Sequence, residues 1–207
     1  MHLAVLGASG RTGWLLVQLA LAQGHQVRAL VRASQGLPAL EGLELIQGDA
    51  TSFSSVLAAA QGSEAVISCL GPRPEGDPLI CSQATAHVLA AMQKGGPKRY
   101  VLVSGMALDL PGDAKSMANR VASWLTQRLG GPMMADKARE LAELLESDAI
   151  YTALRPPRLT QGLASGKVRF DLKDCPGRSI SRGDLAASLL ACVAAQAHLR
   201  QAPFISN

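Results

Sequence analysis

Short apolar runs alternate with longer amphipathic stretches along this chain. Six runs are rich in Val, Ile and Leu and are bounded by Gly, Pro or charged residues, which is typical of strands in a buried parallel sheet. They are His2–Leu6, Gln26–Val31, Leu43–Gln47, Ala65–Leu70, Tyr100–Val103 and Ile150–Leu154. The stretches with helical spacing between them are Thr12–Gln23, Ser54–Ala60, Gln83–Lys94 and Asp136–Glu146. This alternation predicts a single α/β domain over residues 1–207, with a doubly wound parallel sheet of the Rossmann type.

Two further segments are not required by that alternation. Ala114–Leu129 has helical spacing, with one apolar face made of Met117, Val121, Trp124, Leu125 and Leu129. Lys167–Leu172 has the character of a strand, and a helix is expected from about Asp184. Ser181 precedes Asp184 by three residues and is a candidate N-cap.

Composition narrows the class of protein. The chain is 48% hydrophobic and 17% charged, so it can bury a core. Its net charge of +4 comes from scattered residues, and no nucleic-acid partner is expected. The longest apolar stretch, Leu185–Val193, is too short to span a bilayer, so no membrane partner is expected. No signal peptide precedes the first strand, which predicts a cytoplasmic protein.

The four cysteines do not indicate a metal site. Cys69, Cys81, Cys175 and Cys192 form no C-x-x-C pair, and no histidine adjoins any of them. We expect reduced thiols and no bound metal.

A glycine-rich turn follows the first predicted strand and opens the first predicted helix. In such a turn the first glycine permits the bend, the second lets backbone approach a pyrophosphate, and the third allows close helix–strand packing. The helix N-terminus presents free N–H groups and its positive dipole end to the phosphates. Although a glycine cluster alone is a weak signal, its position predicts a dinucleotide site. The expected contacts are Gly7, Ser9, Gly10, Arg11, Thr12 and Gly13.

The second strand ends at Arg32, where NAD-binding folds carry an acidic residue for the ribose 2′-hydroxyl. A carboxylate there would repel a 2′-phosphate, whereas a guanidinium can pair with it through two hydrogen bonds. Arg11 in the turn can add a second charge. The alternative is that Arg32 is only a solvated surface residue. The topological position favours a phosphate contact and predicts NADPH, or NADP(H) in either redox state, as the cofactor.

The ends of the third and fourth strands complete the predicted cofactor site. Asp49, next to Ala50, either accepts a hydrogen bond from the adenine amino group or belongs to the N-cap region of the next helix. Leu70 and Gly71 are expected to border the ribose or nicotinamide half through their backbone.

Several motifs together resemble the atypical short-chain dehydrogenase/reductases. They are Gly-Ala-Ser-Gly-Arg-Thr-Gly at 7–13, Leu-Val-Arg at 30–32, Gly-Asp at 48–49, Leu-Arg-Pro-Pro at 154–157 and Ile-Ser-Arg-Gly-Asp-Leu at 180–185. The likeness covers essentially the whole chain. Within this superfamily the chain is most similar to the NAD(P)H-binding group that contains biliverdin-IXβ reductase/flavin reductase.

The resemblance implies an NADPH-dependent reductase that acts on flavins, biliverdins or similar conjugated acceptors. It implies that the turn at 7–13 binds the pyrophosphate, Arg32 the 2′-phosphate, and Asp49 with Ala50 the adenine. It also implies that Ser104 and Pro156 lie near the nicotinamide. Members are often monomeric, so we expect a monomer or a weak homodimer with a small-molecule acceptor.

Three departures from the family pattern concern the acceptor side. Gly105 stands where the family often has an active-site serine, and Arg158 stands where the reductase has a histidine after the Pro-Pro pair. The stretch 109–134 is longer than in the family. We expect residues of about 105–135 and 156–180 to form the side of the site that binds the substrate. The second of these segments would belong to a small C-terminal extension of the domain. These departures leave the particular acceptor open.

The residues present also limit the chemistry. The common reaction of short-chain dehydrogenases uses a Tyr-x-x-x-Lys pair as its proton donor. Neither tyrosine forms one, because Tyr100 is followed four positions later by Ser104 and Tyr151 by Arg155. A flavin or bilin, however, can accept hydride and then take a proton from water, so orientation by the protein suffices.

The hypothesis is therefore hydride transfer from NADPH to a planar conjugated acceptor. Ser104 would orient the nicotinamide or the acceptor, and Arg158 would pair with an acidic group of the substrate, with Lys137 as a weaker candidate for that role. Met106 and Trp124 would line the acceptor pocket. The alternatives are that Ser104 only caps a turn, that Arg158 is a surface residue, and that the apolar residues are plain core.

A second function from a different class stays open. The protein could bind NADP without turnover and act as a redox sensor, as in the NmrA-like branch that the chain also resembles. Gly105 and the missing Tyr-Lys pair favour this alternative. A sensor should offer a partner surface, and an exposed apolar face on Ala114–Leu129 would be one.

Overall fold

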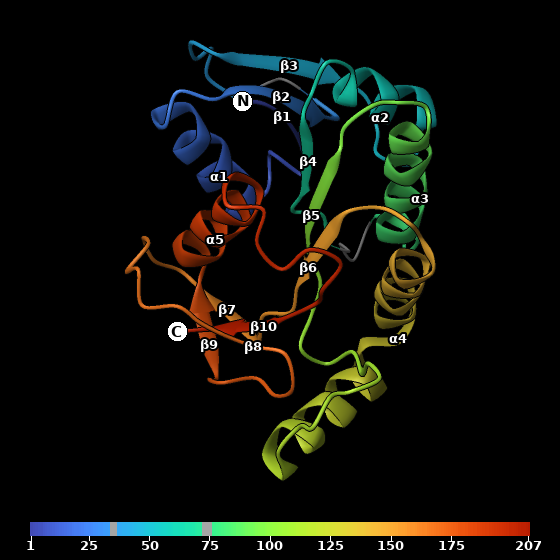
Figure 1. The fold of residues 1–207 in the computed structure, drawn as a ribbon, viewed down its shortest axis with the longest axis vertical. Helices are drawn as coiled ribbons and strands as arrows, with labels where there is room; N and C mark the ends of the chain where they lie inside the picture. Colours follow the sequence, from blue (N-terminus) through green and yellow to red (C-terminus); the bar gives the residue numbers. More distant parts are fainter. Residues whose placement is uncertain (34–36, 72–75) are drawn as a thin grey trace.

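The computed structural model describes residues 1–33, 37–71 and 76–207. At its centre is a six-stranded parallel sheet with the strand order β3-β2-β1-β4-β5-β6 (Figure 1). The strands are β1 (His2–Leu6), β2 (Gln26–Val31), β3 (Leu43–Gln47), β4 (Ala65–Ser68), β5 (Arg99–Val103) and β6 (Tyr151–Leu154). The predicted Rossmann-type sheet is confirmed, and each of its strands lies within two residues of its predicted bounds.

Helices cover both faces of the sheet. Helices α1 (Arg11–Ala22) and α5 (Arg182–Ala194) pack together on one face. Helices α2 (Phe53–Ala60), α3 (Ile80–Gln93) and α4 (Met117–Glu146) lie on the other (Figure 1). Successive side chains of a strand point to opposite faces, so β1 contributes alternate residues to two separate cores. This double covering explains why the strands read as continuous apolar runs.

The strand order reverses between β1 and β4. The chain runs outward from β1 through β2 to β3, then crosses back to β4 and continues through β5 to β6. Loops at the carboxyl ends of β1 and β4 therefore diverge to opposite faces of the sheet. In open α/β sheets this point forms the crevice in which ligands bind.

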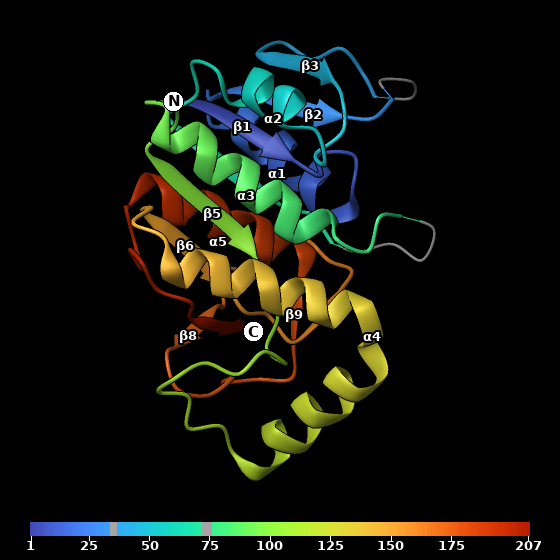
Figure 2. The same cartoon turned by 90° about the vertical axis from the view of Figure 1, so that its right-hand side faces the viewer.

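Helix α4 is made of two helices joined at a sharp kink, which agrees with the two helices that the sequence predicted at Ala114–Leu129 and Asp136–Glu146. Gly131 has non-helical angles (φ 50°, ψ −137°) and Pro132 follows it. Proline cannot donate the backbone hydrogen bond that would continue the helix, and glycine tolerates the positive φ. The later part of α4 packs on α3, whereas the earlier part projects away from the sheet (Figure 2).

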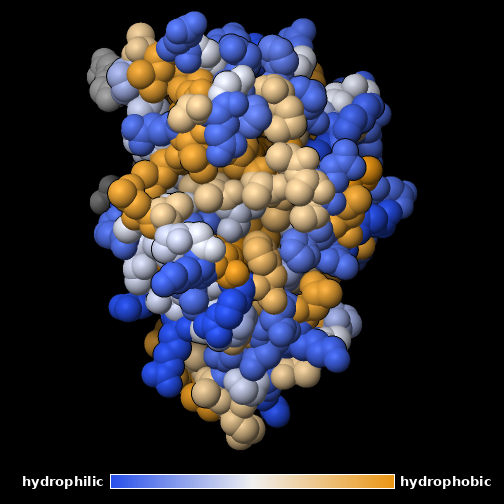
Figure 3. Space-filling view, turned by 60° about the vertical axis from the view of Figure 1, so that its left-hand side comes forward, coloured by the Kyte–Doolittle hydropathy of each residue, from blue (hydrophilic) through white to orange (hydrophobic). Residues whose placement is uncertain are grey.

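The C-terminal extension consists of two small two-stranded sheets. β7 (Arg158–Thr160) pairs in parallel with β9 (Ser179–Ser181), and β8 (Arg169–Asp171) pairs antiparallel with β10 (Phe204–Ser206). Strand β8 lies within the predicted strand Lys167–Leu172, which the structure shortens. From the side shown in Figure 3, an apolar band crosses the middle of the molecule, with hydrophilic side chains above and below it.

The start of α5 was predicted two residues late, but its cap is confirmed. Ser181 is the N-cap residue, and its hydroxyl accepts a hydrogen bond from Asp184 N at 2.9 Å. This cap fixes the end of α5 that faces the crevice.

Candidate functional site

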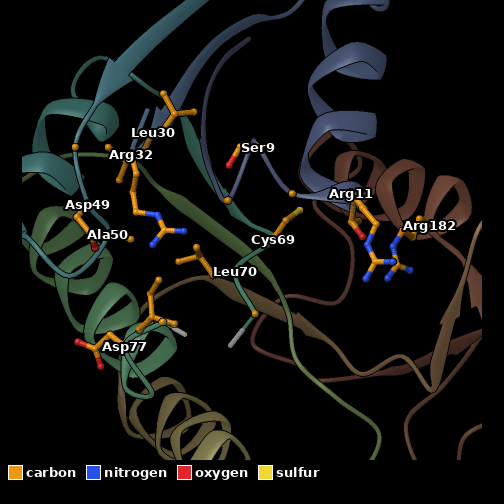
Figure 4. A pocket seen from close by; sticks show the side chains of 18 of the residues that line it. Ser9, Arg11, Leu30, Arg32, Asp49, Ala50, Cys69, Leu70, Asp77 and Arg182 are labelled. Carbon is orange, nitrogen blue, oxygen red and sulfur yellow. The ribbon is translucent and has the colours of Figure 1, made fainter. Parts of the chain in front are cut away.

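A cavity of about 370 Å³ lies at the carboxyl ends of the central strands (Figure 4). Ten of the thirteen predicted cofactor residues line it: Gly7, Ser9, Gly10, Arg11, Thr12, Arg32, Asp49, Ala50, Leu70 and Gly71. The lining also includes residues that were not predicted, namely Leu30, Val31, Gly48, Cys69, Gly76, Asp77, Ile80, Leu159 and Arg182. The cavity therefore gathers loops from both sides of the topological reversal.

The glycine turn is shaped by close backbone contacts. Gly7 has φ +76°, which favours glycine. A Cβ on Gly13 would lie 2.1 Å from Gly7 O, so only glycine lets α1 begin this close to β1. Gly13 thus acts in packing and does not line the cavity. Gly10 is the N-cap of α1 without a side-chain cap, and no acidic residue occupies the first turn. The first-turn N–H groups are left for an external acceptor.

At one end of the cavity Arg32 lies near Asp49 (Figure 4). The Asp49 carboxylate accepts hydrogen bonds from Thr51 N at 2.9 Å and from Thr51 Oγ1 at 2.8 Å. These bonds, together with the charge of Arg32, lower the pKa of Asp49. Asp49 is not the N-cap of α2, which is Ser52. It instead holds the turn after β3 while bordering the cavity, and Arg32 is exposed at the end of β2.

At the other end two arginine side chains lie side by side, Arg11 from α1 and Arg182 from α5 (Figure 4). Arg182 is 9% exposed, and within the described structure its Nε has no hydrogen-bond partner. Burial, and then the charge of Arg11, lower the pKa of Arg182. Two adjacent cations with a buried unpaired N–H are suited to an anion. Arg182 was not among the predicted site residues, although it lies inside the motif at 180–185.

Two predicted cofactor residues, Ser104 and Pro156, lie beyond the cavity lining. Ser104 follows β5 and is 8% exposed, and its hydroxyl has no hydrogen-bond partner in the described part of the chain. The ammonium of Lys137 links this strand end to the cavity, because it donates to Val103 O at 2.8 Å and to Leu70 O at 3.3 Å. Pro156 is buried, and its carbonyl accepts from Met106 N at 3.0 Å. The roles of Ser104 and Pro156 at the nicotinamide stay predictions.

Lys137 belongs to a buried polar network on the α3–α4 side of the sheet. It donates to Glu140 at 2.8 Å, and Thr85 connects Glu140 to the hydroxyl of Tyr100. Burial alone would lower the pKa of Lys137, but the Glu140 carboxylate outweighs it and holds that pKa above its usual value. Burial raises the pKa of Tyr100, which is fully buried. A tyrosine and a lysine therefore meet in space, but this tyrosine does not reach the cavity.

The cysteines near the cavity are not reactive thiolates. Burial raises the pKa of Cys69 and of Cys81 to about 12 in each case. Both are therefore protonated thiols at neutral pH, and a thiolate nucleophile is not available from them.

The three predicted acceptor contacts are not gathered at the cavity. Arg158 is exposed on β7, while its neighbour Leu159, which points to the opposite face of the strand, lines the cavity. Trp124 is 58% exposed on the projecting part of α4. Met106 is half-buried and is held by its backbone to Pro156. Arg158, the cation predicted to meet an acidic group of the substrate, lies in solvent, whereas the cavity is lined by Arg182, which was not predicted.

These observations define a dinucleotide-binding protein of the Rossmann type. Three features fit the phosphates of such a group: the N-terminus of α1 without a side-chain cap, the close approach at the glycine turn, and the Arg182 Nε, which has no partner among the residues that the structure describes. The chain belongs to the NAD(P)H-binding family, whose profile matches residues 7–196.

Known proteins resemble the chain over nearly its whole length. It is 28% identical to an uncharacterised chloroplastic protein of Arabidopsis thaliana, over 95% of this chain and 71% of that protein. It is 27% identical to the divinyl chlorophyllide a 8-vinyl-reductase of the same plant, over 97% of this chain but only 52% of the relative. Among solved structures it resembles the anaerobilin reductase ChuY of Escherichia coli O157:H7, with a TM-score of 0.81, 25% identity and coverage of 100% and 97%.

The family and these neighbours support an NAD(P)H-binding oxidoreductase. They also bear out the predicted likeness to reductases of the atypical short-chain group. Within the described residues, no helix combines the length and the apolar character needed to cross a bilayer.

Proposed function

We propose that the protein is an NADPH-dependent reductase that transfers hydride to a planar conjugated acceptor such as a flavin or a bilin. The observation that carries the choice of cofactor is Arg32, a cation at the end of β2 in the cavity lining, where a carboxylate would accompany NAD. The named reductases among the relatives, which act on a chlorophyllide and on an anaerobilin by their descriptions, support an acceptor with an extended ring system.

The chain's own residues supply binding and orientation in this proposal. Arg32 pairs with the 2′-phosphate, and the first-turn N–H groups of α1, with Arg11, hold the pyrophosphate. Bound NADPH supplies the hydride. Ser104 has a buried hydroxyl that finds no partner among the described residues, and we assign it to the nicotinamide or the acceptor.

Proton transfer from a tyrosine is not part of the proposal. The sequence has no Tyr-x-x-x-Lys pair, and Tyr100 lies in the buried network with a raised pKa. An acceptor that spreads charge over its rings can take its proton from water after the hydride arrives.

The test is to mix the protein with NADPH and FMN, FAD or biliverdin, and to follow the absorbance of the reduced nicotinamide. We expect turnover above a protein-free blank with at least one acceptor. We expect Ser104→Ala to lower the turnover, because the buried hydroxyl is lost, and Ser147→Ala, at the end of α4 and outside the cavity lining, to leave it unchanged. No turnover with any conjugated acceptor would overturn the reductase.

Cofactor binding without turnover would instead support the second candidate, a redox sensor of the NmrA-like kind. The observation that favours it is the exposed apolar face on the first part of α4. A sensor must discriminate oxidised from reduced cofactor, so NADP⁺ and NADPH would bind with clearly different affinities.

A further inference from the structure

The first part of α4, residues 117–130, turns its polar side toward the protein. Asn119, Ser123 and Gln127 recur every fourth residue and so lie on one face of the helix. Asn119 Nδ2 donates to Asp174 Oδ1 at 2.6 Å and to Cys175 O at 3.0 Å. Gln127 Nε2 donates to Asp109 Oδ2 at 2.9 Å and to Ala107 O. These hydrogen bonds fix the polar side of the segment against the molecule.

The opposite side of the same segment is apolar and faces solvent. We call it the outer face, and it consists of Met117, Val121, Trp124, Leu125 and Leu129, which are 72%, 53%, 58%, 44% and 83% exposed. Helices of globular proteins normally bury such a stripe and expose their polar side. Here the arrangement is reversed, and the segment projects from the body of the molecule (Figure 2). A contiguous exposed apolar face of this kind marks an interaction surface.

The charged residues within the first part of α4 are all basic. From 114 to 135 the sequence has three basic residues and no acidic one. Lys115 is buried in ion pairs with Asp109 and Asp113, so Arg120 and Arg128 are the exposed cations of the first part of α4. Arg128 lies over the ring of Trp124, with its guanidinium carbon 5.8 Å from the ring centroid. By helical spacing Arg120 borders the outer face, whereas Arg128 lies within it beside Trp124. Apolar side chains accompanied by Trp and Arg are found on helices that lie at a lipid–water interface.

The neighbouring C-terminal extension adds to this positive charge. Residues 156–181 carry five basic side chains against two acidic ones. The two segments adjoin, because Ala114 N donates to Lys173 O at 2.8 Å. When the two partners of Lys115, Asp109 and Asp113, are included, residues 109–135 and 156–181 carry eight basic and four acidic residues, whereas the whole chain has 20 and 16. The positive charge of the protein is thus concentrated in the segments beside the outer face.

We propose that the outer face docks on an anionic lipid bilayer, with the first part of α4 lying parallel to the membrane surface. The apolar side chains would enter the headgroup boundary while Arg120 and Arg128 contact lipid phosphates. A two-fold pairing of this face with a second copy is disfavoured, because it would bring the arginines of both copies together without a carboxylate from the first part of either α4.

This proposal does not depend on the reductase reaction. It departs from the expectation that the protein has no membrane partner. That expectation rested on the length of apolar runs, which detects spanning segments but not a one-sided helix at the surface.

The experiment is flotation of the full chain with vesicles of phosphatidylcholine alone or with added phosphatidylglycerol. We expect binding only to the anionic vesicles and weaker binding at high salt, because salt screens the arginines. In a Trp14→Phe background, Trp124 emission should shift to shorter wavelength on binding.

The variant Val121→Gln/Leu125→Gln/Leu129→Gln should lose binding by at least about tenfold, since it removes apolar surface without touching buried residues. The matched control is Leu40→Gln/Leu57→Gln, which replaces leucines that are 38% and 36% exposed elsewhere. Circular dichroism and the thermal midpoint would establish that both variants are folded.

Three results would overturn the proposal. One is an absence of binding to the anionic vesicles, and another is equal binding of the outer-face variant and its control. The third is a parent protein that is dimeric without lipid together with an outer-face variant that is monomeric. This result would show that the outer face binds a second copy.

Discussion

At the residue scale, the carboxylate of Asp184 joins the C-terminal extension to α5. It accepts hydrogen bonds from Ser181, from Ser165, from Gly166 N and from Asn207. Burial alone would raise the pKa of Asp184, but these bonds outweigh it and lower that pKa to about 2. The ionised form of one side chain therefore secures three separate segments.

We predict that this contribution disappears in acid. The folded pKa lies below the unfolded value of about 3.9, so the stabilisation is fully present above about pH 4 and is lost as the pH falls through about 2. At neutral pH the shift corresponds to about 2.5 kcal/mol. Urea unfolding of the parent and of Asp184→Asn should show a difference at about pH 6 that shrinks by about pH 2.5.

The exposed Asp148 provides the control, since Asp148→Asn should leave the free energy of unfolding unchanged at both pH values. If the free energy of unfolding differed between the parent and Asp184→Asn by the same amount at both pH values, this role of Asp184 would be contradicted.

The sequence revealed some of the cavity residues and not others. The glycine turn, Arg32 and Asp49 stand directly after strands with a strong apolar pattern, so the fold class alone places them at the crevice. Arg182 and Leu159 come from the far end of the chain, and only tertiary packing of α5 and β7 brings them to α1. No local pattern encodes that packing.

At the element scale, a buried ion pair holds the long loop after β5. Arg155, at the end of β6, makes two hydrogen bonds of 2.7 Å to the carboxylate of Asp113. Arg155 also donates to Ala202 O and lies over the ring of Phe204, 3.7 Å from its centroid. The side chains of the pair are 1% and 8% exposed. The loop is thereby fixed to β6 and to the segment that leads into β10.

We predict that Asp113→Ala destabilises the fold by about 3–5 kcal/mol, because it leaves the buried charge of Arg155 without its partner. Urea unfolding would measure this. Asp109→Ala, in the same loop, should cost about 1 kcal/mol or less, since Asp109 is 65% exposed in its pair with Lys115. Equal losses in the two variants would show that burial of the Arg155–Asp113 pair does not govern the stability of the loop.

Elements in which apolar residues recur with a clear strand or helix spacing were predicted from the sequence, and elements without such a spacing were not. The six central strands and the helices among them follow from the alternation of apolar runs. β7, β9 and β10 have three residues each, which is too short to show a period. The apolar face of Ala114–Leu129 was recognised in the sequence, but its outward orientation depends on hydrogen bonds from the polar side to residues distant in the sequence.

At the scale of the whole molecule, the cavity has cations at both ends and glycine backbone between them. Arg32 lies at one end and Arg11 with Arg182 at the other (Figure 4). NADPH carries a 2′-phosphate and a pyrophosphate, and this distribution of charge is the basis of the proposed cofactor preference.

The most direct test of that preference is calorimetric titration of the protein with NADPH and with NADH. We predict that NADPH binds at least about tenfold more tightly, and that Arg32→Ala removes the difference by weakening NADPH alone. Arg28→Gln, on the same strand but paired with Glu44, should retain it. Equal affinity of the parent for the two cofactors, or an unchanged preference in Arg32→Ala, would contradict the assignment of this cavity to NADPH.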